Sequence, residues 1–442
     1  KLEPGITLSV NEHGHTVKKV FNQAGPSGKT SMITGSRGRN GLPQVLEKLE
    51  AKISDCIKIG LRSDVPLGVF LSSGIDSSIV SYFAKKHKPD LKTFTVYFKE
   101  ESFSERKEAR MIADSFGTDH TEILMEVPEN LPDFVSKVLA QFDEPFGDAS
   151  ALPTYLLCEA ARRYVTVSLS GDGGDELFGG YPTFIASLAF KNYWSHLPSV
   201  LRKKVFPAFA NMIPMTHNKV SLDYKLKRFT GQAGAHDDWR EAHFAWRGAF
   251  GWGDRENIYT NDFHNSISDR LPYDSVINHF SDVKGEPALD QLLYADQKSY
   301  LLDAFLVKMD RMSMAHSLEV RPPFLDPELG ALAWEIDGAY KIKGMKTKWI
   351  LRHMMKGRLP EEARKLPKKG FSPPLAMWFL DPKFSAFFKE TCSSSAFRNL
   401  GIVSPAAVDK YLDEHIQKKA DRSRQLWVLL GLALFAQRRA GK

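Results

Sequence analysis

Residues 67–80, LGVFLSSGIDSSIV, join a short apolar run to a turn rich in hydroxyl groups. The run is typical of a buried strand, and helical apolar spacing follows the turn. In an open parallel sheet, ligands bind beyond the carboxyl ends of the strands, where a helix N-terminus offers unpaired N–H groups and a positive dipole end. Serine hydroxyls add donors, and a glycine lets the backbone approach a phosphate closely. The turn therefore predicts a phosphate cradle made by Ser72, Ser73, Gly74, Ser77 and Ser78.

One carboxylate, Asp76, stands within this turn and would repel phosphate groups unless a cation lay between them. Mg²⁺ bridges carboxylate and phosphate oxygens, so Asp76 is a candidate magnesium ligand. The stretch does not have the GxxxxGK[ST] spacing of a Walker loop. Serine and aspartate also cap helices routinely. This turn alone therefore leaves phosphate binding and helix capping both open.

A second stretch, VTVSLSGDGGDELFGGY at 165–181, repeats the pattern of an apolar strand followed by a polar turn. The turn holds a serine, a glycine and three carboxylates, namely Ser170, Gly171, Asp172, Asp175 and Glu176. Two such turns in one parallel sheet could face the same crevice, where these carboxylates could complete a Mg²⁺ site with Asp76. An acidic calcium-binding loop is the alternative. The carboxylates do not have the spacing of an EF-hand, and a calcium loop would not explain the first turn.

Strand and helix patterns alternate through the first half of the chain. Apolar runs predict further strands at 91–98, 121–127 and 165–170, with helical spacing between them. This alternation indicates an α/β fold with a doubly wound parallel sheet covered by helices on both faces. Beyond about residue 185 the strand signals fade. We therefore expect a nucleotide-binding sheet at 42–185 and a mainly helical part at 186–442.

The first 41 residues have a different character from the rest of the chain. Residues 1–21 have room for one or two strands, and the following stretch, NQAGPSGKTSMITGSRGRNG, is rich in glycine, serine and basic residues. Such a composition is typical of a flexible linker. Residues 1–41 are therefore expected to form a strand segment and a linker ahead of the main domain.

Composition narrows the class of protein. The chain has 442 residues and a net charge of +7, which is dilute for this length and does not favour nucleic acid as a partner. Its cysteines, Cys56, Cys158 and Cys392, lie far apart, which favours a reduced, cytoplasmic protein without a structural metal. The apolar stretch 426–436 falls short of the roughly 20 residues of a membrane span and predicts a buried helix.

Several motifs in one order resemble a known family. GVFLSSGIDSS is similar to the pyrophosphate loop of the ATP pyrophosphatase (PP-loop) superfamily. SLSGDGGDELFGGY and VKMDRMSMAHSLEVRPPFLD resemble the synthetase domain of glutamine-dependent asparagine synthetases of the bacterial type, as do FDEPFGDASALPTYLL and KLPKKGFSPPLAMW. The resemblance covers about residues 42–436. It implies a PP-loop type of sheet extended by a mostly helical C-terminal region.

The resemblance implies a two-step reaction with ATP and Mg²⁺. The side-chain carboxylate of aspartate attacks the α-phosphate of ATP, giving β-aspartyl-AMP and pyrophosphate, and ammonia then displaces AMP to give asparagine. Lys348 matches the lysine that contacts the phosphates and the intermediate, and Asp172 matches a position, often a glutamate, that assists the ammonia step. For Lys348 a solvated helix lysine is the alternative. Asp76 and Asp175 would hold the metal.

The same resemblance implies contacts to the rest of the substrates. ATP and pyrophosphate would be bound by Ser72, Ser73, Gly74, Asp76, Ser77, Val96, Ser170 and Gly171, with the adenine near Val96. Glu319 and Arg321 resemble parts of the substrate pocket, with a buried structural ion pair as the alternative. Ser73 stands where glycine is commoner, which would strain the backbone if that position needed a positive φ.

An N-terminal glutaminase domain with a nucleophilic cysteine usually precedes this domain in the family. Here residue 1 is lysine, and the first cysteine, Cys56, lies in an amphipathic helical pattern. We therefore expect this chain to be the C-terminal part of a longer amidotransferase and to use free ammonia alone. The resemblance also points to a homodimer, often formed through the glutaminase domain.

Other enzymes share these motifs. Related amidotransferases, β-lactam synthetases and lasso-peptide cyclases adenylate other carboxylates, and the acceptor pocket alone separates them. A tRNA-modifying enzyme with a pyrophosphate loop is a further alternative, although such enzymes usually add an RNA-binding domain or sulfur-transfer cysteines. Aspartate, ammonia and ATP are thus the expected small-molecule partners, with neither nucleic acid nor a membrane among them.

Overall fold

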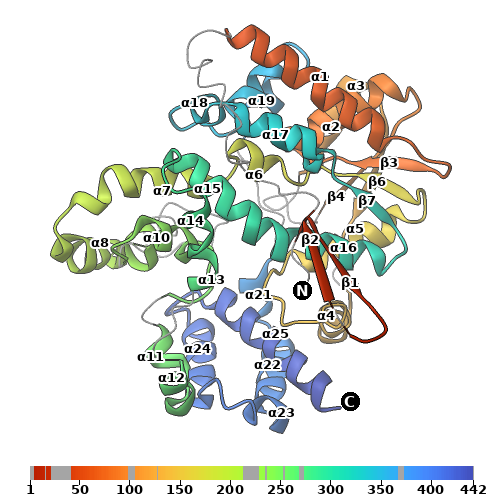
Figure 1. The fold of residues 1–442 in the computed structure, drawn as a ribbon. Helices are drawn as coiled ribbons and strands as arrows, with labels where there is room; N and C mark the ends of the chain where they lie inside the picture. Colours follow the sequence, from red (N-terminus) through yellow and green to blue (C-terminus); the bar gives the residue numbers. More distant parts are fainter. Residues whose placement is uncertain are drawn as a thin grey trace.

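The computed structural model describes residues 4–14, 16–20, 41–97, 105–126, 128–212, 228–233, 236–251, 254–267, 273–366 and 373–441. At its centre is a five-stranded parallel sheet in the order β5-β4-β3-β6-β7 (Figure 1). The strands are β3 (Leu67–Phe70), β4 (Lys92–Tyr97), β5 (Asp119–Leu124), β6 (Val167–Leu169) and β7 (Glu319–Arg321). The predicted α/β class with a parallel sheet is confirmed.

Both faces of the sheet are buried, which explains its apolar strands. Val69, next to α2 (Ile75–His87), belongs to a core formed with α1 (Leu42–Gly60). Phe70, one residue on, points to the other face and packs with α5 (Ala151–Ala161). Figure 1 shows α1 and α2 on one side of the sheet and α5 on the other.

The order of the strands reverses between β3 and β6. The chain runs from β3 outward to β4 and β5, then returns to place β6 on the other side of β3. This is the topological switch point, where α/β sheets bind ligands. The two hydroxyl-rich turns predicted from sequence follow these two strands, so they emerge side by side at one edge of the sheet.

The expectation that strands end near residue 185 is wrong at one place. Residues Glu319–Arg321 form β7, which pairs with β6 in parallel register. The strand has three residues, and two of them are charged, so it has no apolar run that sequence periodicity could detect. Its position at the edge of the sheet explains why charged side chains are tolerated there.

Outside the sheet, the described residues are mostly helical. Before residue 285 lie α3 (Arg106–Phe116), α4 (Leu131–Leu139), α6 (Gly174–Phe178), α7 (Pro182–Asn192), α8 (Phe206–Met212), α10 (Trp239–Ala245), α11 (Arg255–Ile258), α12 (Asn261–Ser266), α13 (Asp274–Ile277) and α14 (His279–Asp282). Then follow α15 (Ala288–Asp296), α16 (Val307–Met314), α17 (Pro327–Glu335), α18 (Gly338–Lys341), α19 (Trp349–Met354), α20 (Glu361–Lys365), α21 (Leu375–Trp378), α22 (Pro382–Ser393), α23 (Ser395–Arg398), α24 (Pro405–Ile416) and α25 (Ser423–Ala440). Shorter or wider helices are Trp194–His196, Leu201–Val205, Arg228–Ala233, η7 (Gln297–Leu306) and Pro323–Leu325.

Helices away from the sheet pack into hydrophobic cores of their own. The C-terminal helix α25 is buried among α4, α22 and α24, as the apolar stretch 426–436 predicts. Among the described residues, no helix has both the length and the apolar character needed to cross a membrane. A second cluster joins α7, α10 and α15 beside the sheet.

The N-terminal residues form a two-stranded antiparallel hairpin, β1 (Ile6–Val10) with β2 (Thr16–Val20). Most of the predicted linker, 21–40, lies outside the described residues, as does 367–372 of the motif KLPKKGFSPPLAMW. The proposed division at residue 42 therefore stays a prediction.

Candidate active site

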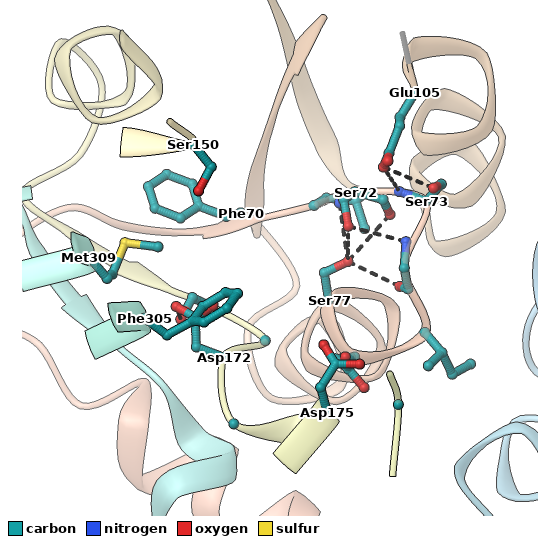
Figure 2. Close-up of a pocket in the computed structure, with 18 of the residues that line it drawn as sticks. Phe70, Ser72, Ser73, Ser77, Glu105, Ser150, Asp172, Asp175, Phe305 and Met309 are labelled. Carbon is teal, nitrogen blue, oxygen red and sulfur yellow. Dashed lines mark hydrogen bonds between the residues drawn. The ribbon is translucent and has the colours of Figure 1, made fainter. Parts of the chain in front are cut away.

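A cavity of about 480 Å³ lies at the carboxyl ends of β3 and β6 (Figure 2). Eleven of the thirteen residues to which the resemblance assigns a role line it: Ser72, Ser73, Gly74, Asp76, Ser77, Val96, Ser170, Gly171, Asp172, Asp175 and Lys348. Ser78, the fifth residue of the predicted cradle, is buried and does not line it. The eleven residues come from four separate segments of the chain. The structure thus brings the two predicted turns and the distant lysine to one cavity.

The first turn is held together by its own hydroxyl groups. The Ser72 hydroxyl lies 2.9 Å from that of Ser77, and it accepts a hydrogen bond from the Gly74 N–H at 3.1 Å. The Ser77 and Ser78 hydroxyls donate to the Gly74 carbonyl. The helix α2 begins with no side-chain cap, so helix capping does not account for these hydroxyls. Ser73 has no positive φ, so serine is not strained there.

A carboxylate that sequence reasoning missed already contacts this turn. Glu105 accepts hydrogen bonds from the N–H of Ser73 at 3.0 Å and from its hydroxyl at 2.8 Å. Figure 2 shows Glu105 facing Ser73 at the edge of the cavity. Because a carboxylate binds there, this backbone N–H and hydroxyl form an anion site. Glu105 is 32 residues from Ser73, and nothing in its local pattern marks it.

Glycines in the second turn allow the two turns to meet. A Cβ atom added at Gly174 would lie 2.7 Å from Cγ of Asp76. A Cβ atom at Gly180 would lie 1.8 Å from Oδ1 of Asp175 and 2.2 Å from Cε of Lys348. Side chains cannot approach that closely, so these positions need glycine for close packing. The two glycines keep the acidic groups and the lysine in contact.

The ammonium group of Lys348 lies between the carboxylates of Asp76 and Asp175. It is 2.6 Å from Oδ1 of Asp175 and also binds Oδ2 of Asp76. Burial alone would lower the pKa of Lys348, but the two carboxylates outweigh burial and raise it. Lys348 is therefore charged at neutral pH.

The solvated helix lysine considered from sequence is wrong for Lys348. The helix α19 begins one residue later, at Trp349, and Lys348 has a left-handed φ of 51°. Its side chain is buried, with 4% of the residue exposed. A non-glycine residue in this conformation is uncommon, and here it directs a cation into the cavity.

The acidic pair fits the expected Mg²⁺ in the type of its donors. Carboxylates from Asp76 and Asp175 are hard oxygen ligands, and Mg²⁺ is usually held by one or two carboxylates together with substrate phosphates. Among the described residues, no group of three or more His, Cys, Asp or Glu side chains could hold a metal ion by itself. Any Mg²⁺ held by Asp76 and Asp175 would therefore take its remaining ligands from water or from a bound substrate.

The other carboxylates of the second turn are held in place by neighbours. Asp172 accepts a hydrogen bond from the Ser170 hydroxyl at 3.0 Å. Glu176 is 1% exposed and accepts from the Tyr181 hydroxyl. Burial, with Glu176 nearby, raises the pKa of Tyr181 well above its usual value, so the hydroxyl keeps its proton and donates. Both Asp172 and Glu176 line the cavity.

The remaining two predicted residues do not join the cavity. Glu319 and Arg321 form an ion pair on β7 at 2.6 Å, and neither lines the cavity. Arg321 also donates to the carbonyls of Gly60 and Arg62. Their side chains are 56% and 30% exposed, so the pair is not buried either. It connects β7 to the end of α1.

Sequence reasoning also missed a buried cation on the far side of the cavity. Lys308 lies on α16, within the motif VKMDRM, and binds Asp148 and Ser150 from the segment DEPFGDAS. Aromatic side chains of Tyr181, Tyr300 and Phe305 complete this side. No local pattern distinguishes Lys308 from an ordinary helix lysine, because its partners lie 158 or more residues away.

The fold and site define an α/β protein with an anion-binding cavity at the switch point of its sheet. Comparison with known proteins shows which protein family the chain belongs to. Residues 48–437 match the asparagine synthase family, so the chain belongs to that family. This match confirms the resemblance drawn from the motifs.

Three curated relatives illustrate the similarity. The chain is 29% identical to asparagine synthetase [glutamine-hydrolyzing] 1 of Bacillus subtilis over 97% of its own length and 64% of the relative's. It is 30% identical to a putative asparagine synthetase of Mycobacterium bovis, over 87% and 56% of the two lengths. It is 38% identical to a putative asparagine synthetase [glutamine-hydrolyzing] 2 of Methanocaldococcus jannaschii over a shorter stretch, which covers 36% of the chain and 31% of the relative. The chain thus spans about three fifths of the length of the first two.

Proposed function

We propose that this chain is an ATP-dependent amide ligase that converts aspartate and ammonia into asparagine, with release of AMP and pyrophosphate. The observation that carries this proposal is the Lys348 ammonium between Asp76 and Asp175, beside two hydroxyl-rich turns. Membership of the asparagine synthase family supports it. The chain covers only 64% and 56% of the lengths of the first two relatives, so the asparagine synthetase activity in their names is also a proposal for this chain.

In the first step, an oxygen of the aspartate side chain attacks the α-phosphorus of ATP. The bond from this phosphorus to the bridging oxygen breaks, and pyrophosphate leaves with the electron pair. Negative charge grows on the leaving group, which the hydroxyl and N–H donors of Ser72, Ser73 and Ser77 would stabilise. Lys348 would move from the carboxylates toward the phosphates as a compact positive charge on a flexible stem.

The carboxylates of Asp76 and Asp175 would assist the same step by holding a metal ion. Asp76 and Asp175 would hold Mg²⁺ together with phosphate oxygens, and the ion would supply charge neutralisation on the leaving pyrophosphate. The two carboxylates otherwise bind Lys348. Release of Lys348 from this pair would free it for the nucleotide. The same three residues would thus serve both the empty and the loaded site.

In the second step, the ammonia nitrogen attacks the acyl carbon of β-aspartyl-AMP, and the bond from that carbon to AMP breaks. The nitrogen must lose a proton as the amide forms. Asp172 is proposed to accept or orient that proton, and its hydrogen bond from Ser170 fixes the orientation of the carboxylate. Replacement Asp172→Asn should slow asparagine formation more than pyrophosphate release.

The test is pyrophosphate release from ATP, Mg²⁺ and ammonium, with and without aspartate, with the products identified by mass. Aspartate-dependent pyrophosphate together with asparagine supports the proposal. Asp76→Ala should abolish both products, whereas Asp64→Asn, an exposed site ahead of β3, should not change them. Turnover that ignores aspartate would refute the proposed substrate.

The nitrogen donor and the carboxylate acceptor are tested in the same assay, and binding of tRNA is tested separately. Glutamine in place of ammonium should not support synthesis by the residues present here, since the expected glutaminase nucleophile is not among them. Pyrophosphate release driven by another carboxylate would favour a different acceptor, as in β-lactam synthetases or lasso-peptide cyclases. A gel mobility shift with tRNA would favour a tRNA-modifying enzyme.

A further inference from the structure

The side of the cavity opposite the phosphate turn holds a fixed pair of opposite charges. Lys308 donates to Oδ2 of Asp148 at 3.0 Å and to the Ser150 hydroxyl at 2.7 Å. Figure 2 shows Ser150, Phe305 and Met309 on the side of the cavity away from Ser73 and Glu105. All of these residues line the same cavity. The charge pair and the phosphate turn therefore face one another across the space where a substrate would bind.

The pair is built rigidly from two elements. Asp148 precedes α5 and accepts from the N–H of Ser150 at 2.9 Å and from its hydroxyl at 2.8 Å. Lys308 lies on α16, which packs against α5. Lys308 is 4% exposed, and its ammonium lies 4.1 Å from the centre of the Phe305 ring. Burial would raise the pKa of Asp148, but Lys308 and the Ser150 donors lower it, so the Asp148 carboxylate is charged at neutral pH.

Both charged groups have capacity for a further partner. An ammonium has three donors, and the two hydrogen bonds to Asp148 and Ser150 use two of them. A carboxylate has about four acceptor positions, and the described contacts of Asp148 use three. A ligand that carries one negative and one positive group next to each other would match this arrangement. An α-amino acid is such a ligand, since its α-carboxylate and α-ammonium share one carbon.

We propose that Lys308 and Asp148 are specificity-determining residues that bind the α-carboxylate and the α-ammonium of an amino-acid substrate. This rests on the proposed function, because it places the side-chain carboxylate of that substrate toward the phosphate turn. Held at its α-carbon, an amino acid with a short acidic side chain presents its second carboxylate to ATP. A carboxylate substrate that lacks the α-carboxylate or the α-ammonium would leave Lys308 or Asp148 without a partner on the substrate.

The experiment measures pyrophosphate release with three carboxylates that differ in one group each. Aspartate carries both α-groups, succinate has no α-ammonium, and β-alanine has no α-carboxylate. The wild-type chain should prefer aspartate to both. In Asp148→Asn the preference over succinate should fall by about tenfold or more, while the preference over β-alanine changes less. Lys308→Met should show the opposite pattern.

Controls separate recognition from folding. Lys356→Met and Asp310→Asn replace exposed residues with the same changes and should keep the wild-type preferences. Since Lys308 is buried, circular dichroism and the KM for ATP check that each variant folds. If both variants raise the KM for ATP in step with that for aspartate and leave the preferences unchanged, the pair is structural and the proposal is overturned.

Failure of the proposed function gives a different result. If the wild-type chain adenylates a carboxylate that is not an α-amino acid, the subsite proposal is overturned while adenylation stands. If no carboxylate supports pyrophosphate release, the proposed function fails, and calorimetric binding of aspartate tests the subsite without turnover. Binding that Lys308→Met weakens by about tenfold or more would then support the subsite, and equal binding or none would overturn it.

Discussion

The Glu105 carboxylate accepts hydrogen bonds from both the backbone N–H and the hydroxyl of Ser73, at 3.0 and 2.8 Å. These two donors belong to the turn that the sequence pattern assigns to phosphate. The Glu105 carboxylate therefore occupies the two Ser73 donors that a phosphate group would use. Binding of a nucleotide at Ser73 would require Glu105 to move away.

The first prediction follows from this competition. Glu105→Gln keeps the size of the side chain but removes its charge, so Ser73 should be released more readily to a phosphate. We expect the KM for ATP to fall by about threefold to tenfold, since hydrogen bonds to charged groups are stronger than neutral ones. Steady-state pyrophosphate release measures this. Exposed Glu129→Gln serves as the matched control, and a KM for ATP that rises would contradict the competition.

The second prediction concerns Lys348 and its two carboxylates. Lys348→Met leaves Asp76 and Asp175 facing each other without a cation, so pyrophosphate release should fall by about a hundredfold or more. The free energy of unfolding should fall by about 3 kcal/mol, because breaking a buried ion pair leaves uncompensated charge. Urea denaturation measures this. Adding Asp175→Asn to Lys348→Met should recover part of the stability but none of the activity.

If the double variant were no more stable than Lys348→Met, repulsion between the two carboxylates would not be the cause of the loss. The loss of stability in Lys348→Met would then come from the missing contacts of Lys348 itself.

The third prediction tests the close approach at the second turn. Gly180→Ala would place a Cβ atom 1.8 Å from Oδ1 of Asp175, so the turn must shift and activity should fall by about a hundredfold. Gly330→Ala is the matched control, because nothing lies within 4 Å of its added Cβ atom. It lies inside helix α17 and should stabilise the protein by about 1 kcal/mol. Full activity in Gly180→Ala would show that the turn does not need this contact.

The fourth prediction concerns acid stability. Burial, aided by the positive charge of Arg110, lowers the pKa of His120 from 6.5 to about 4. A depressed folded-state pKa means that this group contributes stability above pH 6.5 and loses it as the pH falls toward about 4. His120→Gln should therefore lose less of its free energy of unfolding over that range than the wild-type chain. Thermal melts at several pH values measure this.

The exposed His13→Gln should reproduce the wild-type pH curve and serves as the control. If His120→Gln gave that same curve as well, protonation of the buried His120 ring would not contribute to the loss of stability in acid.

Much of the sheet was predictable because its strands are buried on both faces. The runs at 91–98 and 165–170 contain β4 and β6, the run at 121–127 overlaps the last four residues of β5, and the turn at 72–78 follows β3. The short strand β7 was not predictable, since two of its three residues are charged and its pairing with β6 is a long-range choice. Local periodicity reports burial along a segment, and it carries no information about which strand a segment will join.

The position of the two polar turns was predictable for a related reason. Hydroxyls, glycines and carboxylates that directly follow an apolar strand lie at the carboxyl end of a parallel sheet, where ligands bind, so a site there could be inferred from their order in the chain. Glu105 and Lys308 could not be inferred this way. Their partners lie 32 and 158 or more residues away, and an isolated glutamate or lysine has many ordinary roles on a surface.

The amino-acid order was therefore sufficient for the α/β class, the two polar turns and the family to which the chain belongs. The motifs also named Lys348 as a site lysine, but only the structure gave its left-handed backbone and its ion pairs with carboxylates that are 272 and 173 residues away in the chain. The motifs misplaced Glu319 and Arg321, which lie at the sheet edge. Folding decides such contacts because distant segments meet at the switch point of the sheet, where their charged side chains are buried close together.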